Sequence, residues 1–378
     1  MRVVITGGGT GGHLSVAKAF LYAFSARGYS CIFIGSSSGQ DKAYFEKEEK
    51  FAQKWFLETS GVVNKRGIGF LKALWQQGRA FKKAYGIIKE FKPDFVLSVG
   101  GYSAAPAAFG ASALRIPLII HEQNAAIGRL NRILKPKAKI FFSSYLESSP
   151  IKFYPVMEVF FTKARVRSAV KTLLFMGGSQ GARAINNFAL SSLNVLKERG
   201  IKVFHQCGNK DLVRVVSEYA NEGLKVGILK ESLKVWQDST ESQIIDRVEF
   251  VELGEFSGVD VVVFGFSKMM AEIYALCDFA VCRAGASSLW ELCANGLPAL
   301  FVPYPYAASN HQYYNAKFIE EKGLGFLCLE QDLFCEVLWD SLELLESRIA
   351  QVSADLQKEC ASNAVDLMCD VIEQKIAL

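Results

Sequence analysis

Short apolar runs alternate with longer amphipathic segments along the whole chain. Strands that are apolar throughout and separated by helix-like segments are typical of parallel sheets covered by helices on both faces. The pattern therefore predicts an α/β protein. Ten runs have the length and residue types of buried strands: RVVIT, SCIFIG, DFVLSVG, IPLIIHE, AKIFFSS, TLLFMG, KVFHQCG, VVVFGF, DFAVCR and PALFVPYP.

The order of these elements repeats. The segment VVITGGGTGG has a counterpart in LLFMGGSQGA 170 residues later, and Pro117 and Pro298 each begin an apolar strand after a helix. We therefore predict two doubly wound, Rossmann-like domains, residues 1–155 and 156–355, and a final helix over 356–378 that crosses back to the first domain. Ligands of such folds bind at the carboxyl ends of the strands, here in a cleft that both domains face.

Composition agrees with a well-packed protein, because half of the 378 residues are apolar and 21% are charged. Nine cysteines without a C-x-x-C pair indicate buried thiols in a reducing compartment, and we expect no disulfides. The chain does not open on a long apolar segment, and its longest apolar stretch, 104–120, is interrupted by two prolines, a glycine and an arginine. We expect a soluble or peripheral protein.

Charge divides unevenly between the two halves. Residues 1–160 hold 22 Lys and Arg against 10 Asp and Glu, whereas the remainder holds 21 against 28. A basic half indicates an acidic partner, and without an RNA-binding signature an anionic membrane surface is favoured over nucleic acid. Residues 64–92 hold eight cations and one acid, and two interpretations stay open for their apolar residues, a buried core face or a membrane face: Phe70, Leu74, Trp75 and Phe81.

Two glycine-rich segments each follow a predicted strand. Gly7 to Gly12 satisfy G-x-G-x-x-G, but a dinucleotide site also needs an acid near the end of the second strand, and SCIFIGSSSGQ has none. Backbone N–H groups at a helix start suit a phosphate, although a turn without function stays an alternative. The second loop, Gly177 to Ala182, has the same character, and two phosphate sites exceed what a dehydrogenase requires.

Several polar residues follow predicted strands. Ser288 and Glu291 have the spacing of a capping box, but Glu291 would alternatively accept hydrogen bonds from a ribose diol. Arg283 suits a phosphate contact or an ion pair between the domains. His13, His121 and His311 stand at predicted loop exits, whereas His205 lies within a strand and is expected in the core. Neither D-x-D nor a metal-ligand spacing occurs, which disfavours a metal-dependent mechanism.

Together, GGGTGGH, GGYSAAP, HEQNAAIGRLN, GGSQGARAIN, RAGASSLWELCANGLPALFVPYP and HQYYNA closely resemble the MurG family, over residues 1 to about 325. The resemblance implies an inverting, metal-independent glycosyltransferase of the GT-B fold without a cofactor. Its substrates would be UDP-GlcNAc and undecaprenyl-pyrophosphoryl-MurNAc-pentapeptide, joined at the acceptor C4 hydroxyl (lipid I to lipid II) in peptidoglycan synthesis. Its place would be the cytoplasmic face of the bacterial inner membrane, as a peripheral protein.

The resemblance also implies roles for individual residues. The catalytic base would be His13, with Glu122 as second candidate. Residues in UDP-GlcNAc binding would be Thr10, Gly11, Gly12, Asn124, Ser179, Ser267, Ala286, Ser287, Ser288, Leu289, Trp290, Glu291, His311 and Gln312. Residues that bind the acceptor or support the site would be Tyr102, His121, Asn131, Asn186 and Arg283.

The sequence departs from the family in places. Met157 stands where the family has an arginine that helps to hold the nucleotide, so either Arg165 or another cation replaces it or nucleotide affinity is weaker. Residues 225–265 are longer than in the family. Other open alternatives are a GT-B transferase acting on another lipid such as diacylglycerol, a UDP-GlcNAc epimerase, and a catalytically silent scaffold that binds a nucleotide sugar.

Overall fold

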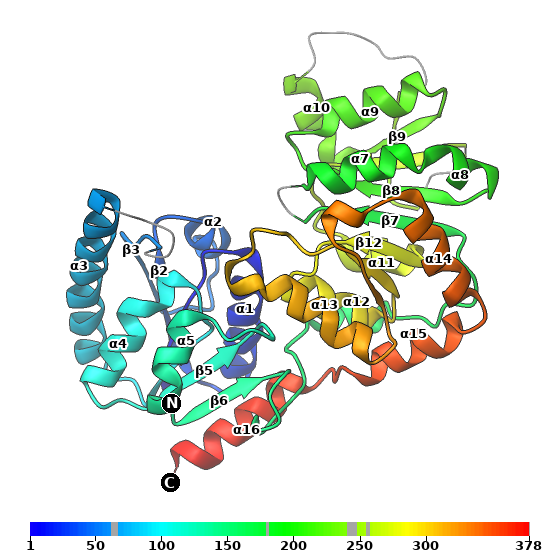
Figure 1. The fold of residues 1–378 in the computed structure, drawn as a ribbon. Helices are drawn as coiled ribbons and strands as arrows, with labels where there is room; N and C mark the ends of the chain where they lie inside the picture. The colour runs from blue at the N-terminus through cyan, green and yellow to red at the C-terminus, as the bar shows by residue number, and fades with distance from the viewer. Residues whose placement is uncertain (62–66, 179–180, 240–247, 255–257, 378) are drawn as a thin grey trace. The chain divides into compact units, whose positions relative to one another are not determined.

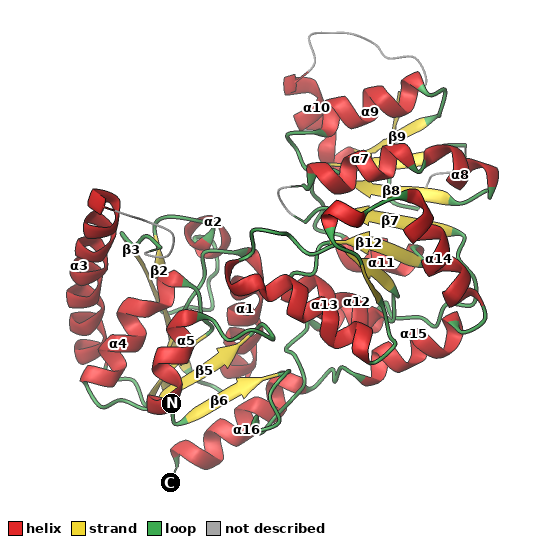
Figure 2. Cartoon of the chain, in the orientation of Figure 1, coloured by secondary structure: helices red, strands yellow, loops and turns green. Residues whose placement is uncertain are grey.

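A computed structural model describes residues 1–377 apart from 62–66, 179–180, 240–247 and 255–257 (Figure 1). The chain forms two compact units. Unit 1 comprises Met1–Met157 and the C-terminal residues from Ala361 onward, and unit 2 comprises Glu158–Cys360. Each unit is a parallel sheet flanked by helices, so the predicted α/β architecture is confirmed (Figure 2).

Within its described residues, unit 1 holds a six-stranded parallel sheet in the order β3-β2-β1-β4-β5-β6, the doubly wound order. The strands are β1 (Arg2–Thr6), β2 (Ser30–Ser36), β3 (Gln53–Leu57), β4 (Phe95–Ser98), β5 (Leu118–Glu122) and β6 (Ile140–Ser143). All five strands predicted for this half are present. The edge strand β3 was not predicted, because in QKWFL only Leu57 is buried and the apolar pattern is weak.

The helices of unit 1 follow the strands and place their connecting loops at the carboxyl edge of the sheet. They are α1 (Gly11–Ala26), α2 (Asp41–Phe45), α3 (Gly67–Phe91), α4 (Ala105–Ala113), α5 (Arg129–Leu134) and α16 (Ala364–Ile376). α16 is tied to α1 through Arg27, whose guanidinium pairs with Asp366, Asp370 and Glu373. α3 buries only one narrow stripe of small and apolar side chains: Ala73, Ala80, Ala84 and Ile88.

Unit 2 holds, in its described residues, an eight-stranded parallel sheet in the order β10-β9-β11-β8-β7-β12-β13-β14. The strands are β7 (Thr172–Met176), β8 (Lys202–Gln206), β9 (Val226–Leu229), β10 (Val248–Val251), β11 (Val261–Phe264), β12 (Phe279–Cys282), β13 (Ala299–Phe301) and β14 (Phe326–Leu327). The five strands predicted for this half are confirmed. β9 and β10 come from the long segment 225–265, which therefore extends one side of the sheet.

The helices of unit 2 cover both faces of its sheet (Figure 2). They are α6 (Glu158–Thr162), α7 (Arg183–Ser191), α8 (Leu193–Glu198), α9 (Leu212–Asn221), α10 (Leu233–Ser239), α11 (Met270–Leu276), α12 (Ala286–Asn295), α13 (His311–Glu321), α14 (Cys335–Glu346) and α15 (Ile349–Lys358). The nine cysteines all lie in described segments and are free thiols, eight of them buried. Among the described helices of either unit, none is long and apolar enough to cross a membrane.

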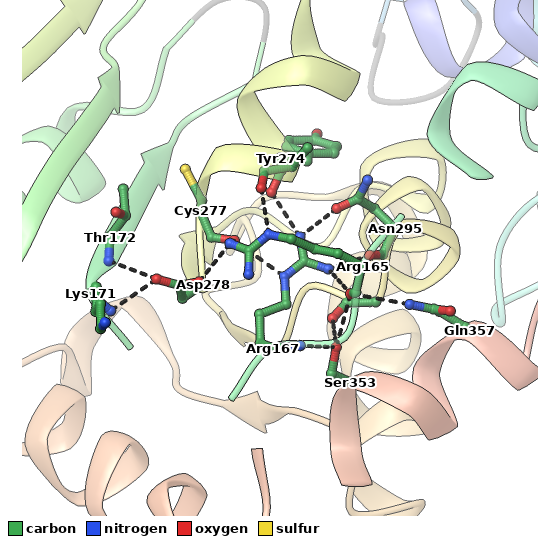
Figure 3. Close-up of polar contacts among 12 residues, drawn as sticks. Arg165, Arg167, Lys171, Thr172, Tyr274, Cys277, Asp278, Asn295, Ser353 and Gln357 are labelled. Carbon is green, nitrogen blue, oxygen red and sulfur yellow. Dashed lines mark hydrogen bonds and ion pairs between the residues drawn. The ribbon is translucent and has the colours of Figure 1, made fainter. Parts of the chain in front are cut away.

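A buried arginine joins four segments of unit 2 (Figure 3). The Arg167 side chain is fully buried and donates hydrogen bonds to the carbonyls of Cys277, Tyr274 and Asn295. Its backbone N–H donates to Ser353 Oγ on α15. Burial lowers the pKa of Arg167 to about 9, so the guanidinium stays protonated at neutral pH. The five donors of one side chain thus satisfy carbonyls that would otherwise be buried without partners.

Replacement of Arg167 by alanine is expected to destabilise unit 2. The carbonyls left unpaired cost desolvation energy, and the loss should reach about 3–5 kcal/mol in the free energy of unfolding. Urea unfolding measures it. The control is Arg199→Ala, which removes a more exposed arginine and its 3.7 Å pair with Glu343, and should cost less than about 1 kcal/mol. Equal losses in the two variants would show that the buried network contributes nothing particular.

Candidate functional site

The glycine-rich turn of unit 1 connects β1 to α1. Gly7, Gly8 and Gly9 adopt φ values of 127°, 156° and 86°, which side-chain-bearing residues rarely reach. The Gly8 N–H donates to Gly100 O at 3.1 Å, which joins this turn to the one that follows β4. α1 begins at Gly11 with Thr10 as N-cap, so the positive end of a 16-residue helix opens directly behind the turn.

His13 lies in the first turn of α1 and is half-buried. Its Nδ1 is 2.8 Å from Thr10 Oγ1. A Cβ built on Gly100 would lie 3.4 Å from His13 Nε2 and 3.3 Å from Asn131 Nδ2, so both side chains pack on that glycine. The structure therefore brings four predicted elements together at the carboxyl ends of β1 and β4: the glycine-rich turn, His13, the GGY segment and Asn131.

Glu122, the second candidate base, is buried at the end of β5 and fully engaged. Its carboxylate accepts hydrogen bonds from Asn124 N at 3.0 Å, Gly128 N at 2.9 Å and Asn131 Nδ2 at 2.9 Å. A carboxylate with three N–H donors is a weak proton acceptor. The bonding favours a positioning role, in which Glu122 shapes the loop from 123 to 128 and holds Asn131.

His121 is buried in the core of unit 1. Its ring stands edge-on to Phe20 and Tyr154, with centroids 6.1 and 5.7 Å away. Burial, with a smaller contribution from the charge of His13, lowers the pKa of His121 to about 3, so the ring is neutral. Neither ring nitrogen has a hydrogen-bond partner within the part of the chain that the structure describes. His121 therefore supports the loop by packing.

The sequence analysis missed Asp41, a buried acid five residues beyond the end of β2. Its carboxylate accepts the Gly9 N–H at 2.5 Å and the Ser36 N–H at 2.8 Å. An acid in this neighbourhood is what a dinucleotide site requires for the ribose, but this one is turned toward the backbone of the glycine-rich turn. Tyr102, a predicted site residue, packs on the other side of that turn and donates its hydroxyl to Ser38 O at 3.0 Å.

The second glycine-rich loop follows β7 in unit 2. Ser179 lies outside the described residues. Gly181 must be glycine, because a Cβ there would lie 2.2 Å from Cys207 O, and α7 begins two residues later. Asn186 on α7 is buried and donates to Cys207 O and to Asp211, so it supports the fold. His205 is buried as expected, and burial lowers its pKa to about 3.

α12 opens at the end of β12 without the expected capping box. The N-cap is Gly285 and no side chain caps the helix, so Ser288 is its third residue. This frees the hydroxyl-bearing first turn, Ser287 and Ser288, from the predicted structural duty. Glu291 is half-buried on the next turn, and burial raises its pKa to about 7. Three other predicted ligand residues have buried side chains in α12, so only their backbone suits ligand contact: Ala286, Leu289 and Trp290.

Arg283 is held inside its own unit. It pairs with Glu330 at 2.6 Å and donates to the carbonyls of Val302 and Pro303. The suggested ion pair between domains is therefore wrong, because Glu330 belongs to unit 2. Arg283 instead fixes the exit of β13, where its guanidinium also lies 5.5 Å from the ring centroid of Tyr304.

Three further predicted residues follow β11 and β13. Gln312 Oε1 accepts the Tyr304 N–H at 2.9 Å, and His311 Nδ1 lies 2.8 Å from Ala308 O. Ser309 and Asn310 just before them have φ values of 55° and 53°, uncommon for residues with side chains. Ser267 is buried at the exit of β11 and accepts the Met269 N–H. The loops after β7, β11, β12 and β13 thus share the carboxyl edge of one parallel sheet.

Arg165 does not replace the family arginine that is absent at Met157. Its guanidinium is committed to Ala275 O at 2.5 Å, Cys277 O at 2.9 Å and the Asp278 carboxylate at 2.6 Å (Figure 3). That alternative is therefore wrong, and the two others stay open. Among the described residues, no group of His, Cys, Asp and Glu side chains has the arrangement of a metal site.

α3 divides the residues for which core and membrane interpretations were open. Its buried stripe is made of small side chains, whereas Phe70, Leu74 and Trp75 are exposed together with Ile68 and Leu71. Phe81 is half-buried beside Tyr85, with ring centroids 6.1 Å apart. The Arg79 guanidinium lies 4.7 Å from the Trp75 ring centroid, so cations and exposed apolar side chains are interleaved on this helix.

Comparison with known proteins agrees with this arrangement. Residues 3–143 match the glycosyltransferase family 28 N-terminal domain, and residues 172–245 and 239–368 match its C-terminal domain. A UDP-N-acetylglucosamine--N-acetylmuramyl-(pentapeptide) pyrophosphoryl-undecaprenol N-acetylglucosamine transferase of Wolinella succinogenes is 46% identical over 98% of this chain and 99% of its own. One of the same name from Helicobacter pylori is 39% identical, with 98% and 99% covered.

Solved structures show the same fold at lower identity. The crystal structure of Acinetobacter baumannii MurG superposes with a TM-score of 0.72 at 24% identity, covering 99% of both chains. A Streptomyces glycosyltransferase, SsfS6, complexed with thymidine diphosphate superposes with a TM-score of 0.60 at 14% identity, also over 99% of both. From the domain matches and the full-length relatives, the chain belongs to glycosyltransferase family 28, and within it to the MurG family of N-acetylglucosamine transferases.

Proposed function

We propose that the chain transfers N-acetylglucosamine from UDP-GlcNAc to the C4 hydroxyl of undecaprenyl-pyrophosphoryl-MurNAc-pentapeptide, converting lipid I to lipid II in peptidoglycan synthesis. Relatives that match it over their whole length carry this reaction in their names. The structural observation that carries the proposal is the pair of glycine-rich turns, one per unit, each ending a parallel strand and leading into a helix N-terminus. Both substrates contain a diphosphate, which such turns suit.

The chemistry follows from the groups around the first turn. The acceptor C4 oxygen attacks the anomeric carbon in line, forming the new C–O bond with inversion from α to β. The bond from that carbon to the diphosphate oxygen breaks, and UDP leaves with its electron pair. His13 Nε2 accepts the hydroxyl proton, while Nδ1 is held by Thr10 Oγ1. The positive N-terminus of α12 stabilises the departing diphosphate without a metal.

Unit 2 would hold the donor. Ser287 and Ser288 lie in the first turn of α12 and would bind phosphate, with Glu291 accepting hydrogen bonds from the ribose diol. The backbone near Ser267 would pair with uracil. Because Gln312 Oε1 already accepts the Tyr304 N–H, its amide group offers donors to a sugar hydroxyl. His311 donates from Nδ1 to Ala308 O in one tautomer, which leaves Nε2 as an acceptor for the sugar.

Unit 1 would hold the acceptor and close over the sugar. Thr10, Gly11 and Gly12 start α1, and Asn124 stands in the loop that the Glu122 carboxylate organises. Tyr102, His121, Asn131 and Glu122 then act as supports of these loops. The exposed apolar residues of α3, with the basic charge of the N-terminal half, would rest the unit on the anionic cytoplasmic surface of the inner membrane.

A transfer assay tests the function. Radiolabelled UDP-GlcNAc and a short-chain lipid-linked MurNAc-pentapeptide should give label in the lipid phase with the wild-type protein. Alanine at His13 should lower turnover by about a hundredfold, the usual loss of a general base. Lys18→Ala changes a residue one turn further along α1, whose ammonium lies 5.5 Å from the Tyr22 ring centroid, and should leave turnover unchanged.

The outcomes separate the alternatives. UDP binding without labelled lipid would identify a silent scaffold, and label on diacylglycerol would identify another lipid transferase. Formation of UDP-N-acetylmannosamine would identify an epimerase. Full turnover of His13→Ala would remove His13 as the base while leaving the transfer reaction in place.

Glu291 should make donor binding depend on pH. Burial raises its pKa to about 7, and the ribose diol needs the ionised carboxylate as acceptor. Protonation as the pH falls from 8 to 6 should therefore weaken UDP-GlcNAc binding, with a limit of about tenfold per pH unit. Calorimetric titration measures the Kd at each pH. Glu291→Gln should bind more weakly at pH 8 and show a flat profile; an unchanged slope would assign the titration to another group.

Membrane association is expected to depend on α3. Leu71 and Trp75 are 64% and 61% exposed, and each contributes about 1.5–3 kcal/mol when buried in an apolar environment. Serine at both positions should therefore lower co-sedimentation with phosphatidylglycerol-containing vesicles by about tenfold or more. Leu344→Ser, at an equally exposed (64%) site on α14 of unit 2, is the matched control. Equal vesicle binding by all three proteins would contradict the assignment of α3.

A further inference from the structure

A buried acid behind the glycine-rich turn of unit 1 has no part in the mechanism above. Asp41 is the first residue of α2 and is fully buried. Its Oδ1 accepts the Gly9 N–H at 2.5 Å and its Oδ2 accepts the Ser36 N–H at 2.8 Å. One carboxylate thus joins the turn after β1 to the end of the neighbouring strand β2.

Two glycines leave room for this carboxylate. A Cβ built on Gly8 would lie 2.4 Å from Asp41 Oδ1, and one built on Gly35 would lie 2.9 Å from Asp41 Oδ2. Contacts this short do not occur between a Cβ and an oxygen, so any side chain at either position would displace the acid. The glycines of the turn therefore serve the carboxylate behind them as well as any ligand in front of them.

Tyr102 closes the turn from another side. A Cβ on Gly9 would meet its ring at 2.8 Å, and one on Gly39 would meet its hydroxyl at 2.9 Å. That hydroxyl donates to Ser38 O at 3.0 Å, in the same β2–α2 connection that carries Asp41. Gly9 is therefore clamped through its N–H by Asp41 and through its Cα by the Tyr102 ring.

The clamp acts on the residues proposed to do the chemistry. Gly9 immediately precedes Thr10, the N-cap of α1, and the Thr10 hydroxyl oxygen is 2.8 Å from His13 Nδ1. The φ of 86° at Gly9 sets the direction in which the chain enters Thr10. A shift of the Gly9 peptide therefore moves the group that orients the imidazole.

We infer that Asp41 is a positioning residue of the transfer reaction, which holds the Gly9 peptide so that Thr10 orients His13 toward the acceptor hydroxyl. The inference rests on the proposed function, in which His13 is the base. Burial raises the pKa of Asp41, but the N–H groups of Gly9 and Ser36 favour the ionised form. Only a carboxylate offers an acceptor to both donors at once, because an amide at the same place directs an NH2 group toward one of them.

Asp41→Asn tests the inference with nearly unchanged size. It should lower kcat by about thirtyfold, since misplacing a catalytic group by about 1 Å costs up to a hundredfold, while the KM for UDP-GlcNAc stays within about threefold. Asp41→Glu should not restore kcat, because Gly8 and Gly35 leave no space for a longer side chain. Asp94→Asn is the matched control: Asp94 also accepts a backbone N–H, from Arg2 at 2.7 Å, at the opposite end of β1.

A second measurement does not need turnover. Amide hydrogen exchange at Gly9 should accelerate by about tenfold or more in Asp41→Asn and stay unchanged in Asp94→Asn, because one hydrogen bond to a charged acceptor is lost. A kcat of Asp41→Asn within threefold of wild type overturns the positioning role, as does a restored kcat in Asp41→Glu. If the wild-type protein transfers no sugar, the proposed function fails, and the exchange data still decide whether Asp41 holds the turn.

Discussion

The site of unit 1 depends on the close approach of two backbone turns that leave no space for side chains. A Cβ on Gly7 would lie 2.6 Å from Gly100 O, and one on Gly101 would lie 2.2 Å from Gly8 O. The turns after β1 and β4 are therefore in direct backbone contact, and Gly8 N donates across to Gly100 O. Because Gly100 lacks a side chain, the rings and amides above it, His13 and Asn131, can pack directly on the peptide.

Buried charges hold the loops around this contact, and each is stabilised by backbone groups. Asp41 and Glu122 accept N–H donors from the turns that follow β1, β2 and β5, whereas Arg167 in unit 2 donates to carbonyls at the ends of α11 and α12. An isolated buried charge costs several kcal/mol, and several hydrogen bonds of about 1.5–3 kcal/mol each offset that cost. These residues convert local charge into fixed loop geometry, which regular secondary structure alone does not supply.

The sequence predicted what depends on apolar pattern and on glycine spacing. All ten predicted strands exist, because each is a run buried on both faces, and both glycine-rich turns lie at strand ends. The edge strands escaped prediction, since β14 has only two residues and β10 exposes its middle, Glu249 and Phe250. The capping box failed because the spacing of Ser288 and Glu291 does not reveal that α12 begins at Gly285. Asp41 and Arg167 act through contacts distant in sequence, which no local pattern encodes.

The α3 helix links the exposed surface of unit 1 to the glycine-rich turn, and the strength of that link can be bounded. Gln77 Nε2 donates to Ser60 O at 3.0 Å and to Tyr102 O at 3.4 Å, and the Tyr102 ring packs on Gly9. Two neutral hydrogen bonds contribute about 1 kcal/mol each, so this route transmits at most a change of about thirtyfold in the loop equilibrium. The turn is held chiefly by Asp41 and by backbone contact, with the membrane-facing helix as a secondary support. A bound surface can therefore adjust the geometry at His13, but it does not have to create it.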